Sequence, residues 1–182
     1  YANVTSDRPI YTPNYRTPPP EIAKEIEKET DALLAAGIIR ESTSPYSAPI
    51  VLVPKKRGGW RYCTDFRRLN KITEKCSFPL PNINDRIRNL KNPKIFTAMD
   101  LLKGYYQIGI SENQKKFYAF TDGKCHLEYN RTPMGAKNSG STMASLMELV
   151  FRGLPVEHLL SYLDDIVATP DVPTHLEVLE KV

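Results

Sequence analysis

Residues 159–168 read Leu-Leu-Ser-Tyr-Leu-Asp-Asp-Ile-Val-Ala, and this stretch decides how the rest of the sequence is interpreted. Two apolar, strand-like runs meet at two adjacent aspartates, which predicts a β-hairpin with the aspartates at its turn. Asp-Asp is a poor choice for a tight turn, because such turns favour residues that tolerate a positive φ and because the two charges repel. A local rule broken between two good strands indicates a functional site.

A second carboxylate, Asp100, follows another strand-like run over residues 95–99. If this strand lies beside the hairpin in one sheet, Asp100 and Asp164 converge at the edge of the sheet. Clustered carboxylates repel one another, and a divalent cation with oxygen ligands, such as Mg²⁺, offsets that repulsion. The pattern therefore predicts a metal-assisted phosphoryl-transfer site. The alternative is that Asp100 is an ordinary turn residue at a strand end.

The remaining sequence alternates between helix and strand signals without a regular strand–helix–strand repeat, which favours an α+β fold. The spacing of apolar residues predicts helices over residues 21–36, 82–90 and 139–151, the last with Met143 and Met147 in the core. Strands are predicted over residues 48–53, 60–65, 118–120 and 126–129. The first 20 residues hold five of the fifteen prolines and are therefore expected to run extended.

Positive charge is concentrated in residues 55–75, where eight basic and two acidic residues give a net charge of +6. The whole chain carries +4, so this segment holds all the excess. Trp60, Tyr62 and Phe66 are interleaved with the basic residues, which is typical of a surface that faces nucleic-acid phosphates. A solvated, charged hairpin is the alternative interpretation.

Composition excludes several classes of protein. No run of about 18 apolar residues is present, which excludes a transmembrane helix, and the proline-rich N-terminus lacks the apolar core of a secretory signal. The three cysteines form no Cys-x-x-Cys pair, so we expect a reducing, intracellular compartment rather than a disulfide framework. The adjacent Cys125 and His126 have no second pair to complete a zinc site.

Six motifs resemble, in order, those of the fingers and palm of reverse transcriptases, and most closely those of gypsy-like LTR retrotransposons. They are residues 36–39 with 44–49, then 60–70, 78–81, 100–108, 133–138 and 162–165. The resemblance covers nearly the whole chain, over residues 8–179. It implies an α+β fold in which an antiparallel, ferredoxin-like palm sheet packs on helices and adjoins a fingers subdomain. It assigns residues 1–20 to an extended arm, 21–78 and 108–137 to the fingers, and 79–107 and 138–182 to the palm.

The resemblance implies an RNA-directed DNA polymerase that extends a primer 3′-OH with deoxynucleoside triphosphates on an RNA or DNA template. Two Mg²⁺ ions, with Mn²⁺ as a substitute, would be held by Asp100, Asp164 and Asp165 beside the Leu101 carbonyl. The residues that would bind the incoming nucleotide are Lys55, Lys56, Arg61, Tyr105, Gln107 and Met134, with Tyr105 excluding a ribose 2′-OH. The residues that would contact nucleic acid are Asp65, Arg67 and Tyr162. Alternatively, Tyr105 is a core aromatic and Arg61 only pairs with Asp65.

Two features depart from the family pattern. Met134 stands where the family usually carries Phe, or Gln in retroviruses, and Ser139-Gly140 replaces Ala-Pro. No residues match the primer grip, thumb, connection or RNase H regions, which a longer polyprotein would supply. The alternative hypothesis is therefore a truncated or domesticated relative that binds nucleic acid or a protein partner without catalysis. The expected location is the cytoplasm or nucleus, in a retroelement particle, with no membrane partner.

Overall fold

The chain folds into two compact units, which a computed structural model describes over residues 3–6, 8–13, 18–55, 59–78, 82–90, 94–153, 159–162, 165–168 and 170–181. For residues 83, 86, 159–162, 165–168 and 181 the description covers the backbone alone. Unit 1 comprises Tyr1–Lys75 and Tyr105–Ser139, and unit 2 comprises Cys76–Gly104 and Gly140–Val182. Each unit therefore combines segments that are distant in the sequence.

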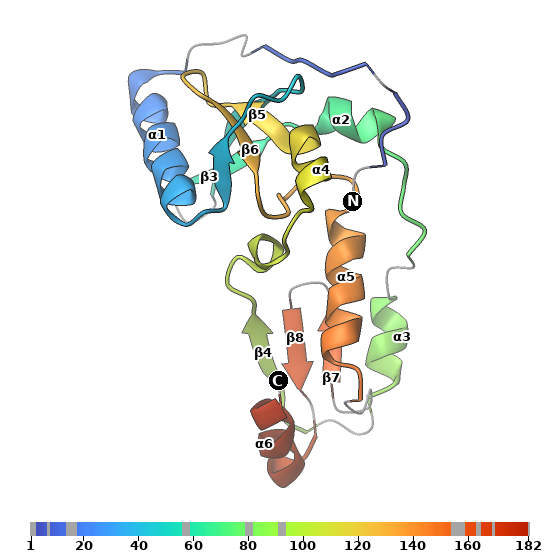
Figure 1. The fold of residues 1–182 in the computed structure, drawn as a ribbon. Coiled ribbons are helices and arrows are strands. Elements are labelled where there is room, and N and C mark those ends of the chain that lie inside the picture. Colours follow the sequence, from blue (N-terminus) through green and yellow to red (C-terminus); the bar gives the residue numbers. More distant parts are fainter. Residues whose placement is uncertain are drawn as a thin grey trace. The chain divides into compact units, whose positions relative to one another are not determined.

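Unit 1 is built on a five-stranded sheet with the strand order β1-β6-β5-β2-β3 (Figure 1). Its strands are β1 (Ile39–Glu41), β2 (Ala48–Pro54), β3 (Trp60–Thr64), β5 (Ala119–Thr121) and β6 (His126–Tyr129). All neighbours are antiparallel except β2 and β5, which pair in parallel. The helical elements are α1 (Pro20–Ala35), α2 (Arg67–Ile72), α4 (Glu112–Lys115), and the 3₁₀ turns η1 (Gly104–Gln107) and η2 (Lys116–Tyr118).

The two ends of helix α1 are determined by particular residues of the sequence. Pro20 occupies the first turn of α1, where the missing N–H has no helical partner to lose. Gly37 follows the helix with a φ of 64°, and its N–H and that of Ile38 donate to the carbonyls of Leu34 and Leu33. This left-handed glycine cap ends the helix and turns the chain into β1.

The core of unit 1 is largely aromatic. Phe120 and Tyr129 are buried with ring centroids 4.9 Å apart, and Phe66 contacts Tyr129 at 6.2 Å. Burial raises the pKa of the Tyr129 hydroxyl well above its ordinary value, and this neutral group shares a 3.0 Å hydrogen bond with the Thr64 hydroxyl. The cluster holds the junction between β3 and α2, which lies within the basic stretch of residues 55–75.

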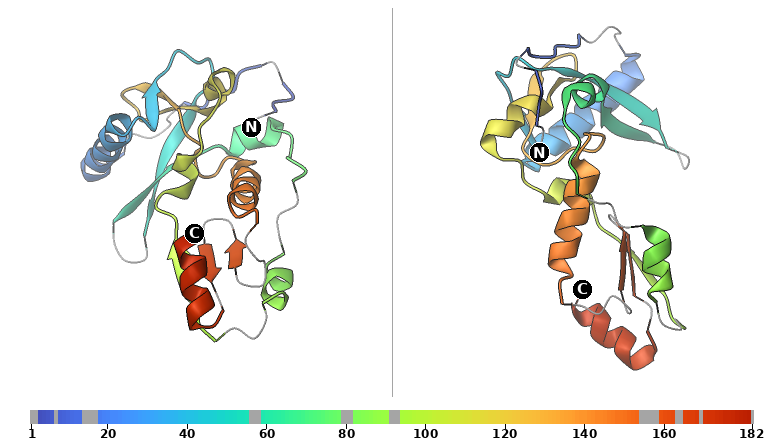
Figure 2. Two further views of the ribbon diagram at one scale, coloured as in Figure 1. Left: turned by 60° about the horizontal axis from the view of Figure 1, so that its bottom comes forward. Right: turned by 90° about the vertical axis from the view of Figure 1, so that its right-hand side faces the viewer.

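Unit 2 contains a three-stranded antiparallel sheet with the order β4-β8-β7. Its strands are β4 (Thr97–Asp100), β7 (Leu159–Tyr162) and β8 (Asp165–Ala168), and its helices are α3 (Ile83–Arg88), α5 (Ser139–Val150) and α6 (Val172–Lys181). Met143 and Met147 on α5 are buried, as the sequence predicted. Helix α6 lies at the end of the sheet where β8 ends (Figure 2), and the Thr97 hydroxyl at the start of β4 lies 2.8 Å from Nε2 of His175 on α6.

The α+β fold class is confirmed, and most predicted helices and strands are present within two or three residues of their predicted bounds. The elements that were not predicted are β1, α2, α4, α6 and the 3₁₀ turns η1 and η2. One local prediction is wrong: Asp165 is the first residue of β8 and pairs with Tyr162, so it belongs to the ladder and not to the turn. Asp164 lies outside the described residues.

None of the described helices combines the length and the apolar character needed to cross a lipid bilayer.

Candidate active site

The strands that carry the predicted reaction centre are neighbours in the sheet of unit 2. Strands β4 and β8 are antiparallel, and the register places Asp100 directly opposite Asp165. The expected adjacency of the strand ending at Asp100 and the hairpin over residues 159–168 is therefore confirmed. Along β4, Thr97 and Met99 are half-buried whereas Ala98 and Asp100 are exposed. Asp100 thus lies on the face of the strand opposite to the one that α6 contacts through Thr97.

The backbone register sets two acidic residues side by side, a type of donor that suits a divalent cation. Acidic residues at directly opposed positions of an antiparallel pair repel each other, and a hard cation with oxygen ligands offsets the repulsion. Among the side chains that the structure describes, no three His, Cys, Asp or Glu residues gather as a metal site would require. The described side chains include neither that of Asp164 nor that of Asp165. The Leu101 carbonyl accepts the Gly104 N–H at 3.3 Å and keeps a second lone pair.

The turn that follows Asp100 depends on a close approach between two segments of unit 2. Lys103 adopts a φ of 51°, and a Cβ placed on Gly104 would lie 2.8 Å from Cε of Met143 and 3.2 Å from Cβ of Leu101. Glycine therefore lets helix α5 approach the turn directly. This packing sets where the chain leaves β4, immediately after the exposed carboxylate.

The cations predicted to bind a triphosphate lie on the β2–β3 ribbon of unit 1. Val53 is directly opposite Arg61, and the N–H of Lys55 donates to the Gly59 carbonyl at 3.0 Å, which continues the ladder towards the tip. Arg61 and Lys55 are exposed, and Val53 on the same ribbon is 44% exposed. The ribbon therefore offers solvent a face of mixed apolar and cationic character. Lys56 lies outside the described residues.

Asp65 and Arg67, both predicted to contact nucleic acid, are paired with each other. The Arg67 guanidinium donates to both carboxylate oxygens at 2.6–3.0 Å, and its backbone N–H donates to Oδ1 at 3.0 Å. These bonds lower the pKa of the Asp65 carboxyl, while the Arg67 side chain remains 85% exposed. The alternative that Arg61 pairs with Asp65 is wrong, because among the described residues the ion-pair partner of Asp65 is Arg67. Asp65 thus orients an exposed cation at the start of α2.

The predicted nucleotide-site residues of unit 1 lie on two segments that run side by side. Residues 105–109 and 130–135 are joined by a bridge between Gly109 and Arg131 and by a 2.8 Å bond from the Thr132 N–H to the Ile108 carbonyl. The predicted residues on these segments are Tyr105, which is half-buried, Gln107, which is exposed, and Met134, which is 51% exposed. The neighbouring Tyr106 packs in the core, stacked on Tyr129 at 6.2 Å.

Residues 53–182 match the reverse transcriptase (RNA-dependent DNA polymerase) family. The chain belongs to this family. Over 99% of its length this reverse transcriptase chain is 35% identical to the retrovirus-related Pol polyprotein from transposon 297 of Drosophila melanogaster, and over 88% it is 32% identical to that from transposon gypsy of the same organism. The resemblance to gypsy-like retrotransposons is therefore confirmed. The chain spans 18% and 16% of the lengths of these two relatives.

A solved structure of the foamy viral protease–reverse transcriptase in complex with double-stranded DNA has the same fold. The similarity covers 99% of this reverse transcriptase chain and 31% of that protein, with a TM-score of 0.88 and 26% sequence identity.

The sequence analysis did not identify the polar residues that hold the loop of residues 133–139, which carries Met134, in this reverse transcriptase chain. Asn70, Lys137 and Asn138 all bond to backbone atoms of distant segments. All three lie within the motifs of residues 60–70 and 133–138. A polar residue in a stretch with well-packed neighbours was the sequence signal that could have identified them.

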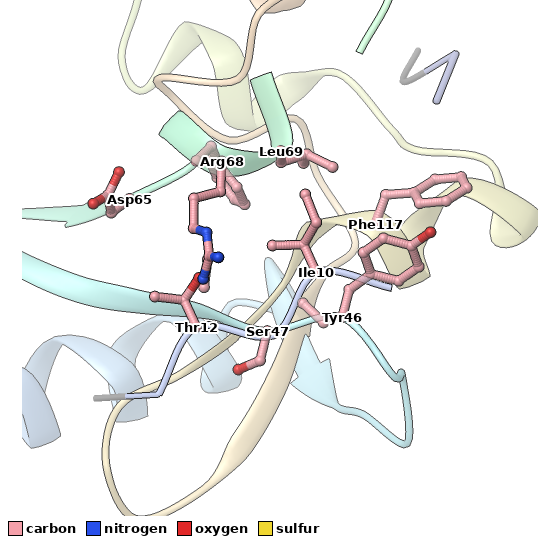
Figure 3. Close-up of a pocket in the computed structure, with 11 residues that line it drawn as sticks. Ile10, Thr12, Tyr46, Ser47, Asp65, Arg68, Leu69 and Phe117 are labelled. Carbon is pink, nitrogen blue, oxygen red and sulfur yellow. The ribbon is translucent and has the colours of Figure 1, made fainter. Parts of the chain in front are cut away.

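A pocket in unit 1 lies where the N-terminal arm crosses the sheet (Figure 3). Its apolar lining includes Ile10, Leu69 and Phe117, and Arg68 donates to the carbonyl of Tyr11 and the hydroxyl of Thr12, both at 3.2 Å. Of the predicted site residues it contains Asp65 alone, whose carboxylate is already paired. We interpret this pocket as the seam where the arm packs on the unit.

Proposed function

We propose that this chain is the fingers and palm of a retroelement RNA-directed DNA polymerase and that it transfers a nucleotide from a deoxynucleoside triphosphate to a primer 3′-OH. The observation that supports this most directly is the register that sets Asp100 opposite Asp165 on adjacent strands. Membership of the reverse transcriptase family and the DNA complex of the foamy viral relative support a nucleic-acid partner. In this proposal unit 1 corresponds to the fingers and unit 2 to the palm.

Asp100, Asp164 and Asp165, with the Leu101 carbonyl, are the proposed ligands of two Mg²⁺ ions, for which Mn²⁺ substitutes. Bound there, such ions activate an attacking hydroxyl and stabilise charge on the leaving oxygen. Asp100 suits this role because its exposed carboxylate has no ion-pair partner among the described residues. Among the described residues, no ion pair has to break before Asp100 coordinates a cation.

The remaining proposed residues bind and select the reactants. Lys55, Lys56 and Arg61 offset the triphosphate charge, and Tyr105 excludes a ribose 2′-OH by the bulk of its ring. Gln107 and Met134 are proposed to line the same nucleotide site. The proposed contacts with template and primer are Asp65, Arg67 and Tyr162, with Asp65 acting by orienting the Arg67 guanidinium. The polymerase is proposed to work inside the cell, in a retroelement particle, with the remaining regions supplied by a longer polyprotein.

Primer extension by the 182-residue chain, with Mg²⁺ and then Mn²⁺, tests the proposal. We expect Asp100→Asn to reduce extension at least 1,000-fold while the melting temperature stays near that of the wild type. Asp85→Asn is the matched control, because Asp85 is an exposed aspartate of unit 2 that pairs with Arg88 on α3. Normal extension by Asp100→Asn would refute the assignment. A wild-type chain that binds an RNA–DNA duplex but never extends it would favour the non-catalytic module instead.

A further inference from the structure

The side chain of Asn70, on helix α2, bonds to two backbone groups of the loop that carries Met134. Its Nδ2 donates to the Gly135 carbonyl at 2.9 Å, and its Oδ1 accepts the N–H of Lys137 at 2.8 Å. An amide presents a donor and an acceptor side by side, so one residue satisfies two backbone groups that lie two positions apart. Because both partners are main chain, these bonds fix the path of the loop itself.

Three further bonds hold the same loop. Nζ of Lys137 donates to the carbonyl of Thr73 at 2.5 Å, and Nδ2 of Asn138 donates to the carbonyl of Glu74 at 3.0 Å. The Ser139 hydroxyl donates to the Pro133 carbonyl at 2.8 Å, which closes the loop on itself. The loop is thus attached to α2 and to the two residues that follow the helix, across more than 60 positions of sequence.

The attachment determines which side chain the loop presents. Pro133 and Ala136 are buried, whereas Met134 between them is 51% exposed. Gly135 has a φ of 85°, and the two bonds from Asn70 bracket the next residue, Ala136. Glycine adopts this conformation without strain but is also free to leave it, so its own backbone restricts the loop little and bonds from outside the loop are needed to hold one path. The Asn70 amide is placed to provide that support.

We infer that Asn70 is a positioning residue for nucleotide binding: it fixes the loop so that Met134 contacts the incoming nucleotide in one orientation. The inference rests on the proposed function, in which Met134 lines the nucleotide site. Without the amide, the loop samples several positions, and nucleotide binding must select one of them. Affinity therefore falls by the fraction of time the loop is correctly placed, while the chemical step on bound substrate changes little.

The test compares Asn70→Ala, Asn70→Asp and a control in steady-state primer extension by the full chain. Asn70→Ala removes both bonds, and Asn70→Asp keeps an acceptor for the Lys137 N–H but sets a carboxylate oxygen against the Gly135 carbonyl. We expect both variants to raise the KM for the deoxynucleotide about 10-fold with kcat within about 2-fold of the wild type. Thr121→Val is the control, because the Thr121 hydroxyl likewise donates to a backbone carbonyl, that of Cys125 at 3.0 Å, in the β5–β6 hairpin of unit 1.

Amide hydrogen exchange at Lys137 and the equilibrium Kd for a deoxynucleotide on a primer–template complete the design. The inference predicts faster exchange and a raised Kd in both Asn70 variants, with wild-type values in Thr121→Val. Unchanged exchange or an unchanged KM in Asn70→Ala would overturn it, as would an equal rise of KM in Thr121→Val. If the wild type fails to extend primers, the proposed catalysis is refuted, and the Kd and exchange values still decide the role of Asn70. A wild type that binds no nucleotide overturns both.

Discussion

The hydrogen bond between Thr97 and His175 provides the sharpest test of how strand β4, which carries Asp100, is held in unit 2. The Thr97 hydroxyl on β4 lies 2.8 Å from Nε2 of His175, whose side chain on α6 is 5% exposed. The other ring nitrogen, Nδ1, has no hydrogen-bond partner among the described residues. Thr97→Val preserves the shape of the side chain but leaves both ring nitrogens of a buried histidine without a partner there.

Leaving a buried polar group unsatisfied costs about 1–3 kcal/mol, so we expect Thr97→Val to lower the free energy of unfolding by that amount. For a chain of this size, about 2 kcal/mol corresponds to a melting temperature lower by about 4–8 °C. Urea denaturation followed by circular dichroism measures the difference. Thr5→Val is the control, because the Thr5 hydroxyl donates to the Ile72 carbonyl at 2.9 Å on the exposed surface of unit 1. We expect that change to stay within about 0.5 kcal/mol.

A double variant separates the bond from general packing. Replacing both partners, as in Thr97→Val with His175→Leu, leaves no unsatisfied polar atom of this pair, so part of the lost stability should return. Equal losses in Thr97→Val and Thr5→Val would refute the reasoning. So would a double variant whose loss equals or exceeds the sum of the two single losses.

Three further predictions concern the proposed binding residues. Arg61→Ala should raise the KM for deoxynucleotides about 10- to 100-fold, because it removes a charge-assisted contact with the triphosphate. Lys124→Ala is the control and should leave this KM unchanged, because Lys124 is an exposed cation already paired with Glu27. Steady-state primer-extension kinetics measures both values. Tyr105→Ala should increase ribonucleotide incorporation relative to deoxynucleotide incorporation at least 10-fold. Tyr105→Phe keeps the ring and should still discriminate against ribonucleotides. Equal discrimination by the two variants would count against exclusion of the 2′-OH by the Tyr105 ring. Because Arg67 lowers the pKa of Asp65, the stability their pair contributes is present above about pH 4 and is lost as the pH falls through the lowered pKa. Thermal melting should therefore show Arg67→Ala less stable than the wild type at pH 7, with the difference shrinking below pH 4; a constant difference would contradict the pairing.

The sequence predicts those parts of the fold that have a periodic pattern of apolar residues or a recognisable local sequence signal. Apolar spacing identified α1 and α5, a continuous apolar run identified β2, and the aspartates of residues 159–168 pointed to the strand that ends at Asp100. Helix α2 was missed because it has six residues and a single buried one, Leu69, so its periodicity is too short to detect. Strand β1 was missed for a similar reason, since three residues become a strand only through pairing with β6.

The contacts that organise the candidate site are harder to read from sequence. Asp65 and Arg67 are two positions apart, and only the turn into α2 brings their side chains together. Asn70 bonds to residues 65 and 67 positions away, and such side-chain to backbone bonds leave no pattern in either segment. The family motifs include these residues, but only the structure shows which backbone and side-chain atoms each of them bonds to.

The most direct test of the central claim is a titration of the chain with substoichiometric Mn²⁺, followed by paramagnetic broadening of backbone amide signals. The account predicts that residues 99–101 and 165–166 broaden first, and that Asp100→Asn removes the effect while Asp85→Asn does not. Broadening that is uniform along the chain, or that persists in Asp100→Asn, would contradict the claim that the aspartates of β4 and β8 hold the catalytic cations.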